Sequence, residues 1–132
     1  MSKIYISLGG NIGNTHGYFI RALQALVDNG IQVKRVSDFI RTKPYGHVKQ
    51  ADFLNAVLEA ETNLEPHKLL QTLKTLETEI GRTPSERWGP RCIDLDILLY
   101  DDLQISTPEL CIPHKDMHNR DFVMIPLKQL KG

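Results

Sequence analysis

Apolar and polar residues alternate along four stretches of the chain, a pattern that is typical of β-strands with one buried face. These stretches are residues 3–8, 31–42, 52–61 and 92–100. In the third stretch, Phe53 and Asn55 lie on the face opposite Leu54 and Ala56, because side chains point alternately to the two sides of a strand. The sequence therefore predicts four strands, and in the third Phe53 and Asn55 share one face.

Apolar residues recur every three or four positions in two further stretches, as in helices with one buried side. The first predicted helix covers residues 16–29, and Gly30 follows it where a C-terminal cap belongs. The second begins at Pro66, a favoured first helical residue, and ends at Gly81. The residues expected to face the core are Phe19, Leu23, Leu26 and Val27 in the first helix and Leu69, Leu70, Leu73, Leu76 and Ile80 in the second.

The order of these elements, βαββαβ, predicts an α+β domain in which helices pack on one face of an antiparallel sheet. After the fourth strand, Asp101 and Asp102 indicate a tight turn that is followed by a short return strand. Residues 112–130 combine a loop with short helices. We expect a single domain over residues 1–132, because no internal repeat or linker divides the chain.

Composition agrees with a folded domain and excludes several classes of protein. The 132 residues are 41% hydrophobic, which excludes a disordered chain, and no apolar run approaches the roughly 20 residues that cross a bilayer. Sixteen basic residues balance sixteen acidic ones, whereas nucleic-acid-binding domains usually carry a basic excess. The N-terminus lacks a secretory signal. We therefore expect a monomeric, cytoplasmic protein that binds neither nucleic acid nor membrane.

The fourth predicted strand carries two aspartates, Asp94 and Asp96, within the stretch RWGPRCIDLDILLY (87–100). Alternation places both on the face opposite the core, about 7 Å apart along the strand. Two close carboxylates repel each other unless a cation lies between them, and Mg²⁺ typically takes one or two carboxylates plus substrate phosphates. The pair alone is compatible with a magnesium site but is more simply explained by two solvated carboxylates on a wet face. The core face would hold Ile93, Leu95, Ile97 and Leu99.

Three arginines, Arg82, Arg87 and Arg91, precede the aspartates within a polar loop. Guanidinium groups bind phosphate oxygens in pairs and do not lose their charge. Arginines beside a carboxylate pair are typical of phosphoryl transfer, in which positioning and charge stabilisation supply most of the catalysis. The alternative is that the arginines only form ion pairs with nearby acidic residues, namely Glu77, Glu79 and Glu86.

The common nucleotide-binding signatures are absent from the sequence, including the P-loop pattern and the kinase HRD and DFG motifs. Gly9, Gly10 and Gly13 follow the first strand without the spacing of a dinucleotide fingerprint. We interpret them as glycines of a tight strand-to-helix turn. His114, which lies near Arg120, is a candidate phosphate ligand, and no pair of the five histidines has zinc-site spacing.

Taken together, these motifs resemble the 6-hydroxymethyl-7,8-dihydropterin pyrophosphokinase family. The resemblance implies a ferredoxin-like α+β fold and an ATP-dependent pyrophosphokinase of folate biosynthesis. Such an enzyme transfers pyrophosphate from ATP to the pterin hydroxymethyl oxygen and releases AMP. The matching segments follow the family's order over nearly the whole chain: LGGNIG (8–13), RTKPYG (41–46), QADFLNAV (50–57), ETEIGR (77–82), RWGPRCIDLDILLY (87–100) and IPHKDMHNRDFVMIPL (112–127).

The resemblance also implies roles for individual residues. Asp94 and Asp96 would hold two Mg²⁺ ions on the triphosphate, and Arg82 and Arg91 would join them in catalysis. The pterin would lie between two aromatic rings, where a flat heteroaromatic ring is favoured. The expected pterin contacts are Thr42, Pro44, Tyr45, Phe53, Asn55, Trp88 and Phe122. The expected ATP contacts are Glu77, Arg82, Arg91, Ile97, His114 and Arg120.

Two other functions are compatible with the residues alone. A metal-dependent phosphohydrolase would use Asp94 and Asp96 with water as the nucleophile, and it would release phosphate without any pterin. A ferredoxin-like binding module would leave the same aspartates solvated, and it would show no Mg²⁺-dependent nucleotide binding. The sequence identifies no residue as a general base.

Overall fold

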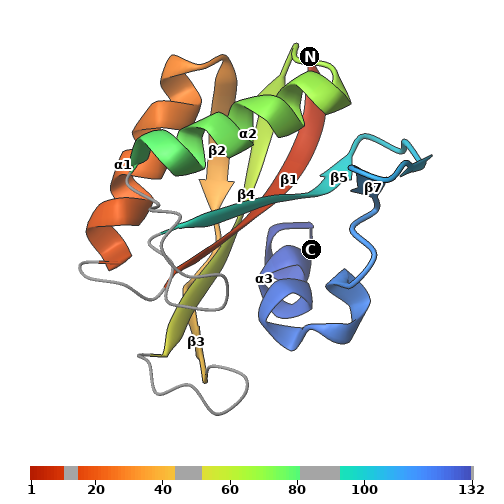
Figure 1. The fold of residues 1–132 in the computed structure, drawn as a ribbon. Coiled ribbons are helices and arrows are strands. Elements are labelled where there is room, and N and C mark those ends of the chain that lie inside the picture. The colour runs from red at the N-terminus through yellow and green to blue at the C-terminus, as the bar shows by residue number, and fades with distance from the viewer. Residues whose placement is uncertain (11–14, 44–51, 81–92, 132) are drawn as a thin grey trace.

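The computed structural model describes residues 1–10, 15–43, 52–80 and 93–131. Its main element is an antiparallel sheet in the order β2-β4-β1-β5, and β3 pairs with the same edge of β4 beyond the end of β2 (Figure 1). This is the predicted ferredoxin-like α+β architecture. The strands are β1 (Ser2–Gly10), β2 (Ile31–Val36), β3 (Ile40–Thr42), β4 (Phe53–Thr62) and β5 (Asp94–Tyr100).

The single strand predicted over residues 31–42 is divided into β2 and β3, so that prediction was wrong in detail. Ser37 lies between the two strands and pairs with Val57 of β4. Its N–H donates to the Val57 carbonyl at 2.8 Å, but its Oγ, not its own carbonyl, accepts the Val57 N–H at 2.9 Å. A side-chain oxygen thus replaces a backbone one, and the regular ladder is interrupted until β3 begins.

Two helices, α1 (Thr15–Asp28) and α2 (Pro66–Ile80), pack on one face of the sheet as predicted. Gly30 has a φ of 85°, which confirms its role as the cap after α1. Val27 is 54% exposed, so its predicted core position is wrong, because it lies on the solvent side of the helix. The buried residues that α1 and α2 contribute to this core are Phe19, Ala22, Leu26, Leu69, Leu73, Leu76 and Ile80.

A third helix, α3 (Asp121–Lys131), covers part of the opposite face of the sheet and follows the 3-10 helix η1 (Met117–Asn119) (Figure 1). The prediction placed helices on one face of the sheet, and α3 adds a helix on the other face. The second face also carries apolar residues, and these lose contact with water only when a helix covers them. This second core consists of Tyr5, Val57, Leu98, Met117, Val123, Leu127 and Leu130.

The predicted return strand does not pair with β5. It is the short β6 (Ile105–Ser106), which forms a separate two-stranded sheet with β7 (Cys111–Ile112). The turn after β5 is instead tied to the first strand, because Asp101 donates its N–H to the Lys3 carbonyl and its Oδ1 accepts the Lys3 N–H, both at 2.8 Å. These bonds direct the chain over the end of β1.

A β-bulge in β5 changes which side chains face each core. Ile97 lies opposite Ile6 and Leu99 lies opposite Tyr5, so Leu98 is one extra residue on β5. As a result, Leu98 is buried against α3, and Tyr100 returns to the core under α1 and α2. The prediction that Leu99 shares the face of Ile97 is wrong, because a bulge shifts the alternation by one residue.

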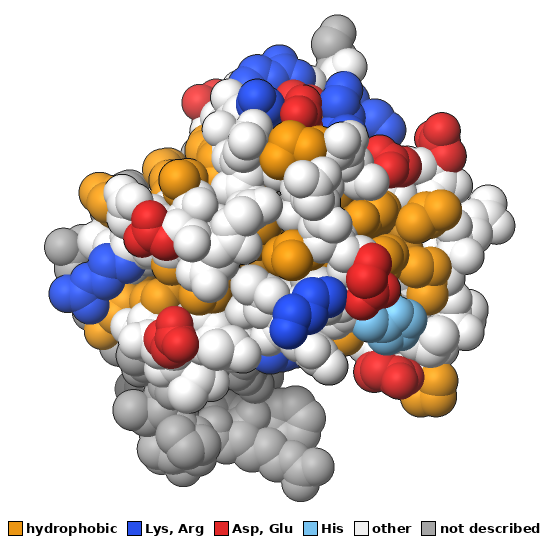
Figure 2. Space-filling view, turned by 90° about the horizontal axis from the view of Figure 1, so that it is seen from above, with side chains coloured by type: hydrophobic (Ala, Val, Ile, Leu, Met, Phe, Trp, Pro, Cys, Tyr) orange, Lys and Arg blue, Asp and Glu red, His pale blue; other side chains and the backbone are white. Residues whose placement is uncertain are grey.

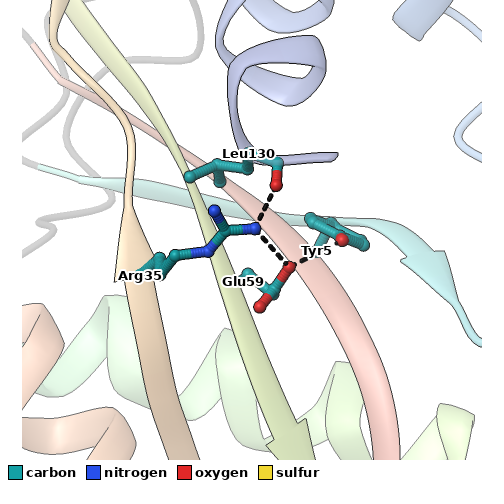
Figure 3. Close-up of polar contacts among 4 residues, drawn as sticks. All are labelled: Tyr5, Arg35, Glu59 and Leu130. Carbon is teal, nitrogen blue, oxygen red and sulfur yellow. Dashed lines mark hydrogen bonds and ion pairs between the residues drawn. The ribbon is translucent and has the colours of Figure 1, made fainter. Parts of the chain in front are cut away.

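The C-terminal end of α3 is held to the sheet by a polar cluster of Tyr5, Arg35, Glu59 and Leu130 (Figure 3). Arg35 donates to Oε1 of Glu59 at 3.1 Å and also to the carbonyl of Leu130. The Tyr5 hydroxyl donates to the same Glu59 oxygen at 2.8 Å. Burial, followed by this hydrogen bond and the negative charge of Glu59, raises the pKa of Tyr5 to about 12.

The same cluster makes the stability of the fold dependent on acid. Burial alone would raise the pKa of Glu59, but hydrogen bonds from Arg35 and Tyr5 and the charges of Arg35 and Lys3 outweigh it and hold the pKa below its ordinary value. A carboxylate with a lowered pKa stabilises the folded state above its unfolded-state pKa, and this contribution is lost as the pH falls through the folded-state pKa.

We therefore expect Glu59→Gln to weaken the dependence of the unfolding temperature on pH below about pH 4.5, the ordinary carboxyl value. Thermal unfolding of both proteins between neutral and acid pH measures this. Glu61→Gln, on the same strand, is the matched control and should leave the steepness of the wild-type curve unchanged. Equal steepness for Glu59→Gln and the wild type would contradict the assignment.

The surface carries both signs of charge. On the face shown in Figure 2, acidic and basic side chains are interspersed with scattered hydrophobic ones. This distribution agrees with the balanced composition and differs from the basic face of a typical nucleic-acid-binding domain. None of the helices in the described ranges is both long and apolar enough to span a bilayer.

Candidate functional site

A cavity of about 310 Å³ lies between the sheet and the N-terminal end of α3. Strands β1, β3, β4 and β5 and helix α3 all contribute side chains to it. It brings together residues that the sequence analysis predicted for the site and that are spread from Thr42 to Phe122 along the chain. The predicted site residues that line the cavity are Thr42, Phe53, Asn55, Asp94, Asp96, Arg120 and Phe122.

The register of the sheet sets the floor of this cavity. Gly9 on the middle strand β1 lies directly between Asn55 on β4 and Asp94 on β5. Since neighbouring strands are about 4.8 Å apart, the backbones at Asn55 and Asp94 are separated by roughly 10 Å. A Cβ at Gly9 would come within 3.2 Å of the Asn55 Oδ1. The absence of a side chain at this position therefore leaves room for Asn55 and for a ligand that lies across the row.

The Asn55 side chain has a fixed orientation. Its Nδ2 donates to the Ile40 carbonyl at 3.1 Å and to the Thr42 Oγ1 at 3.0 Å. A carbonyl can only accept, so this contact identifies the nitrogen side of the amide. Both amide protons are thereby used, and Oδ1 remains as an acceptor above Gly9. Thr42 accepts from Asn55 and therefore keeps its own hydroxyl proton to donate.

Asp94 and Asp96 project from β5 into the same cavity, and both are half-buried. The side chains of Lys43 and Arg120 line it as well, so two positive charges accompany the two negative ones. Oxygen donors of this kind suit Mg²⁺, which keeps several waters and binds through one or two carboxylates and substrate phosphates. No group of three or more His, Cys, Asp or Glu side chains that could hold a metal ion occurs within the described ranges.

Helix α3 begins at the rim of the cavity and carries two predicted site residues there. The Arg120 carbonyl accepts the N–H groups of Val123 and Met124 and so starts the helix. The Arg120 guanidinium lies 5.8 Å from the centre of the Phe122 ring and 3.9 Å from the carboxylate of Asp116. An exposed ion pair of this length is weak, and Arg120 can therefore turn to an anionic ligand at little cost.

Three predicted site residues lie near the cavity without lining it. Glu77 is 2% exposed, and its Oε2 accepts the N–H of Leu95 at 2.9 Å. It therefore supports β5 between the two aspartates. The side chain of Ile97 is in the core, so only its main chain can reach a ligand. His114 accepts the Asp116 N–H at its Nδ1, at 3.2 Å, which leaves Nε2 as the ring atom available to a ligand.

Five predicted site residues lie outside the described residues. They are Pro44, Tyr45, Arg82, Trp88 and Arg91.

Six residues that line the cavity were not predicted as site residues, namely Ser7, Leu8, Gly9, Lys43, Ala56 and Val123. Alternation along residues 3–8 does place Ser7 opposite Ile6 and Leu8. Ser7 and Gly9 could not be assigned to the cavity without knowing that β1 lies between β4 and β5. Pairing between strands that are distant in the chain is not encoded in a local pattern. Lys43 could have been found from its position directly after Thr42.

Comparison with known proteins gives consistent matches. The sequence profile of the family described as 7,8-dihydro-6-hydroxymethylpterin-pyrophosphokinase (HPPK) matches residues 5–132. Three bacterial proteins named 2-amino-4-hydroxy-6-hydroxymethyldihydropteridine pyrophosphokinase are similar over almost the whole chain. The protein of Aquifex aeolicus is 39% identical over 99% of this chain and 81% of its own length. Those of Bacillus subtilis and Haemophilus influenzae are 42% and 43% identical, over 96% and 98% of this chain and 76% and 82% of their own lengths.

Proposed function

The chain belongs to the 7,8-dihydro-6-hydroxymethylpterin-pyrophosphokinase family, and from this premise we propose how its residues serve the reaction. The enzyme transfers pyrophosphate from ATP to the hydroxymethyl group of 6-hydroxymethyl-7,8-dihydropterin in folate biosynthesis. One observation carries the assignment of the site, namely that a single cavity combines two aromatic rings, a fixed amide and two carboxylates. The alternative phosphohydrolase is not supported by the comparisons.

The pterin ring binds between Phe53 and Phe122 in this proposal, since both rings line the cavity from opposite elements, β4 and α3. Stacking on two aromatic faces suits a flat heteroaromatic ring. Asn55 presents only an acceptor, which matches the N–H groups on the pyrimidine edge of a pterin. The Thr42 hydroxyl donates to a neighbouring acceptor on that edge. The contacts predicted for Pro44, Tyr45 and Trp88 remain proposals from the sequence.

The hydroxymethyl group then points along the row of the sheet toward Asp94. The distance from Asn55 to Asp94 is two strand spacings, roughly 10 Å. A fused two-ring heterocycle with a one-carbon arm can cover this distance, with its edge held at Asn55 and its arm reaching Asp94. The row from Asn55 through Gly9 to Asp94 therefore supports binding that aligns the attacking oxygen with the phosphates. Alignment of this kind supplies a large part of the rate of a two-substrate reaction.

Asp94 and Asp96 would hold two Mg²⁺ ions on the triphosphate, and these ions supply Lewis-acid stabilisation of the phosphate oxygens when bound. Arg120 and the Nε2 of His114 bind phosphate oxygens, with Arg82 and Arg91 as further proposed ligands. We propose that the main chain of Ile97 and the carboxylate of Glu77 lie on the side of the site that binds the nucleotide. Glu77 contributes by fixing Leu95 and thereby both aspartates.

In the reaction, the hydroxymethyl oxygen attacks the β-phosphorus of ATP. The new bond joins this oxygen to the β-phosphorus and its proton passes to solvent, the bond from the β-phosphorus to the bridging α,β-oxygen breaks, and AMP leaves. Positive groups around the phosphates neutralise the charge that develops on the departing oxygen. We assign no side chain as the general base.

The function is tested by incubating the protein with ATP, Mg²⁺ and the pterin alcohol and identifying the products by phosphorus-31 NMR. We expect AMP and a pterin pyrophosphate ester. ADP with a monophosphorylated pterin would overturn attack at the β-phosphorus, and inorganic phosphate without a pterin product would indicate a hydrolase. A single domain, a monomeric state and a cytoplasmic location are further proposals that rest on the sequence.

We predict that Phe53→Ala and Phe122→Ala each weaken pterin binding about tenfold, because a stacked ring contributes on the order of 1 kcal/mol or more. ATP affinity should change little. Calorimetric titration of each ligand separates the two effects. Phe39→Ala is the matched control, because Phe39 packs against Phe19 and does not line the cavity. Equal losses for pterin and ATP would contradict a role in stacking.

A further inference from the structure

Ser7 lines the cavity, but the proposed reaction assigns it no role. It projects from the middle strand β1 into the cavity and lies directly opposite Asp96 on β5 and Val57 on β4. Residues that face each other on adjacent antiparallel strands have Cβ atoms about 4.5–5.5 Å apart. A serine hydroxyl at this separation can reach the carboxylate oxygen of the opposite aspartate.

The neighbours of Ser7 leave Asp96 as its natural partner. Val57, on the other side, is apolar and fully buried beneath α3. Along β1, the adjacent positions on the same face are Tyr5, whose hydroxyl is bound to Glu59, and Gly9, which has no side chain. Ser7 is therefore the polar residue at the boundary where the core under α3 ends and the cavity begins.

Both groups are available for this contact. Across the described ranges of the chain, neither the Ser7 hydroxyl nor the Asp96 carboxylate takes part in a hydrogen bond or an ion pair. A hydroxyl carries one proton to donate, and an ionised carboxylate can only accept. The Thr42 hydroxyl oxygen, by contrast, is already engaged by Asn55.

We propose that Ser7 is a positioning residue of the metal site, and that its hydroxyl donates to the Asp96 oxygen that does not face the ion. This inference rests on the proposed role of Asp96 as a metal ligand. A carboxylate held by a second hydrogen bond keeps one orientation toward its ion, and loss of such a partner typically weakens metal binding 10–100-fold. Ser7 thereby acts on the affinity for the metal and does not touch the pterin.

The test is a titration of Mn²⁺ into the protein with α,β-methylene-ATP, followed by electron paramagnetic resonance, which reports bound metal without turnover. We expect Ser7→Ala to bind Mn²⁺ about tenfold more weakly and to keep its affinity for the pterin. Ser7→Thr, which retains the hydroxyl, should restore most of the metal affinity. Wild-type affinity for Mn²⁺ in Ser7→Ala would overturn the inference, and so would an equal loss in the Ala and Thr variants when both unfold at the wild-type temperature.

One further variant, Asp96→Asn, separates this inference from the proposed function. If Asp96→Asn abolishes Mn²⁺ binding and Ser7→Ala does not change it, then only the role of Ser7 is wrong. If Asp96→Asn also binds Mn²⁺ normally, then the metal site itself is wrong. The matched control is Ser106→Ala, an exposed serine on β6, which should leave Mn²⁺ affinity unchanged.

Discussion

Asp94→Asn and Asp96→Asn should each lower turnover by about a thousandfold, because loss of one preorganised charge-stabilising group costs 10²–10³ and each aspartate would hold a metal ion that supplies Lewis-acid stabilisation. Asparagine keeps the size of the side chain and removes its charge. Packing is therefore preserved, and the effect can be assigned to electrostatics.

The folded state should not suffer from these two changes. The aspartates share one face of β5 and are half-buried, so each raises the energy of the other's charged form. We expect unfolding temperatures equal to or slightly above that of the wild type, together with the loss of activity. Asp102→Asn, in the exposed turn that follows β5, is the matched control and should keep normal turnover. Near-normal activity of either active-site variant at ordinary Mg²⁺ concentration would remove the metal assignment.

Asn55→Leu should lower kcat/KM for the pterin by about a hundredfold, because buried polar groups that lose a partner each cost about 1–3 kcal/mol. The substitution removes the acceptor for the pterin edge and also leaves the Ile40 carbonyl without its donor. The affinity for ATP should remain close to the wild-type value. Steady-state kinetics with each substrate varied in turn measures both effects.

Gly9→Ala provides a milder test of the same amide. Its new Cβ would lie 3.2 Å from the Asn55 Oδ1, closer than an ordinary contact, and would displace the amide without deleting it. We expect a smaller loss of pterin affinity than in Asn55→Leu. If Gly9→Ala weakened ATP binding and spared pterin binding, the proposed orientation of the pterin along the row would be wrong.

Local patterns in the sequence predicted the strands and the faces of most side chains. Alternation placed Phe53 and Asn55 opposite Leu54 and Ala56, and the structure confirms this. Such patterns depend on the two-residue period of a strand, which holds wherever one face is buried.

The features that the sequence did not predict depend on distant contacts. The bulge at Leu98 arises where β5 pairs with β1, some ninety residues away in the chain, and no local pattern marks it. The position of α3 on the second face follows from apolar residues contributed by several strands. Likewise, Ser7 and Gly9 became site residues only because the sheet order places β1 between β4 and β5.

The bulge at Leu98 also bears on how this chain can tolerate insertions and deletions. In a regular strand, one added or lost residue turns every later side chain to the opposite face. Here the irregularity lies between the two aspartates and the turn that begins at Asp101. A residue gained or lost at the bulge would therefore change only the faces of the side chains that follow it, while Asp94 and Asp96 keep their register with Gly9 and Ser7. The part of β5 beyond the bulge can thus change in length without moving the carboxylates.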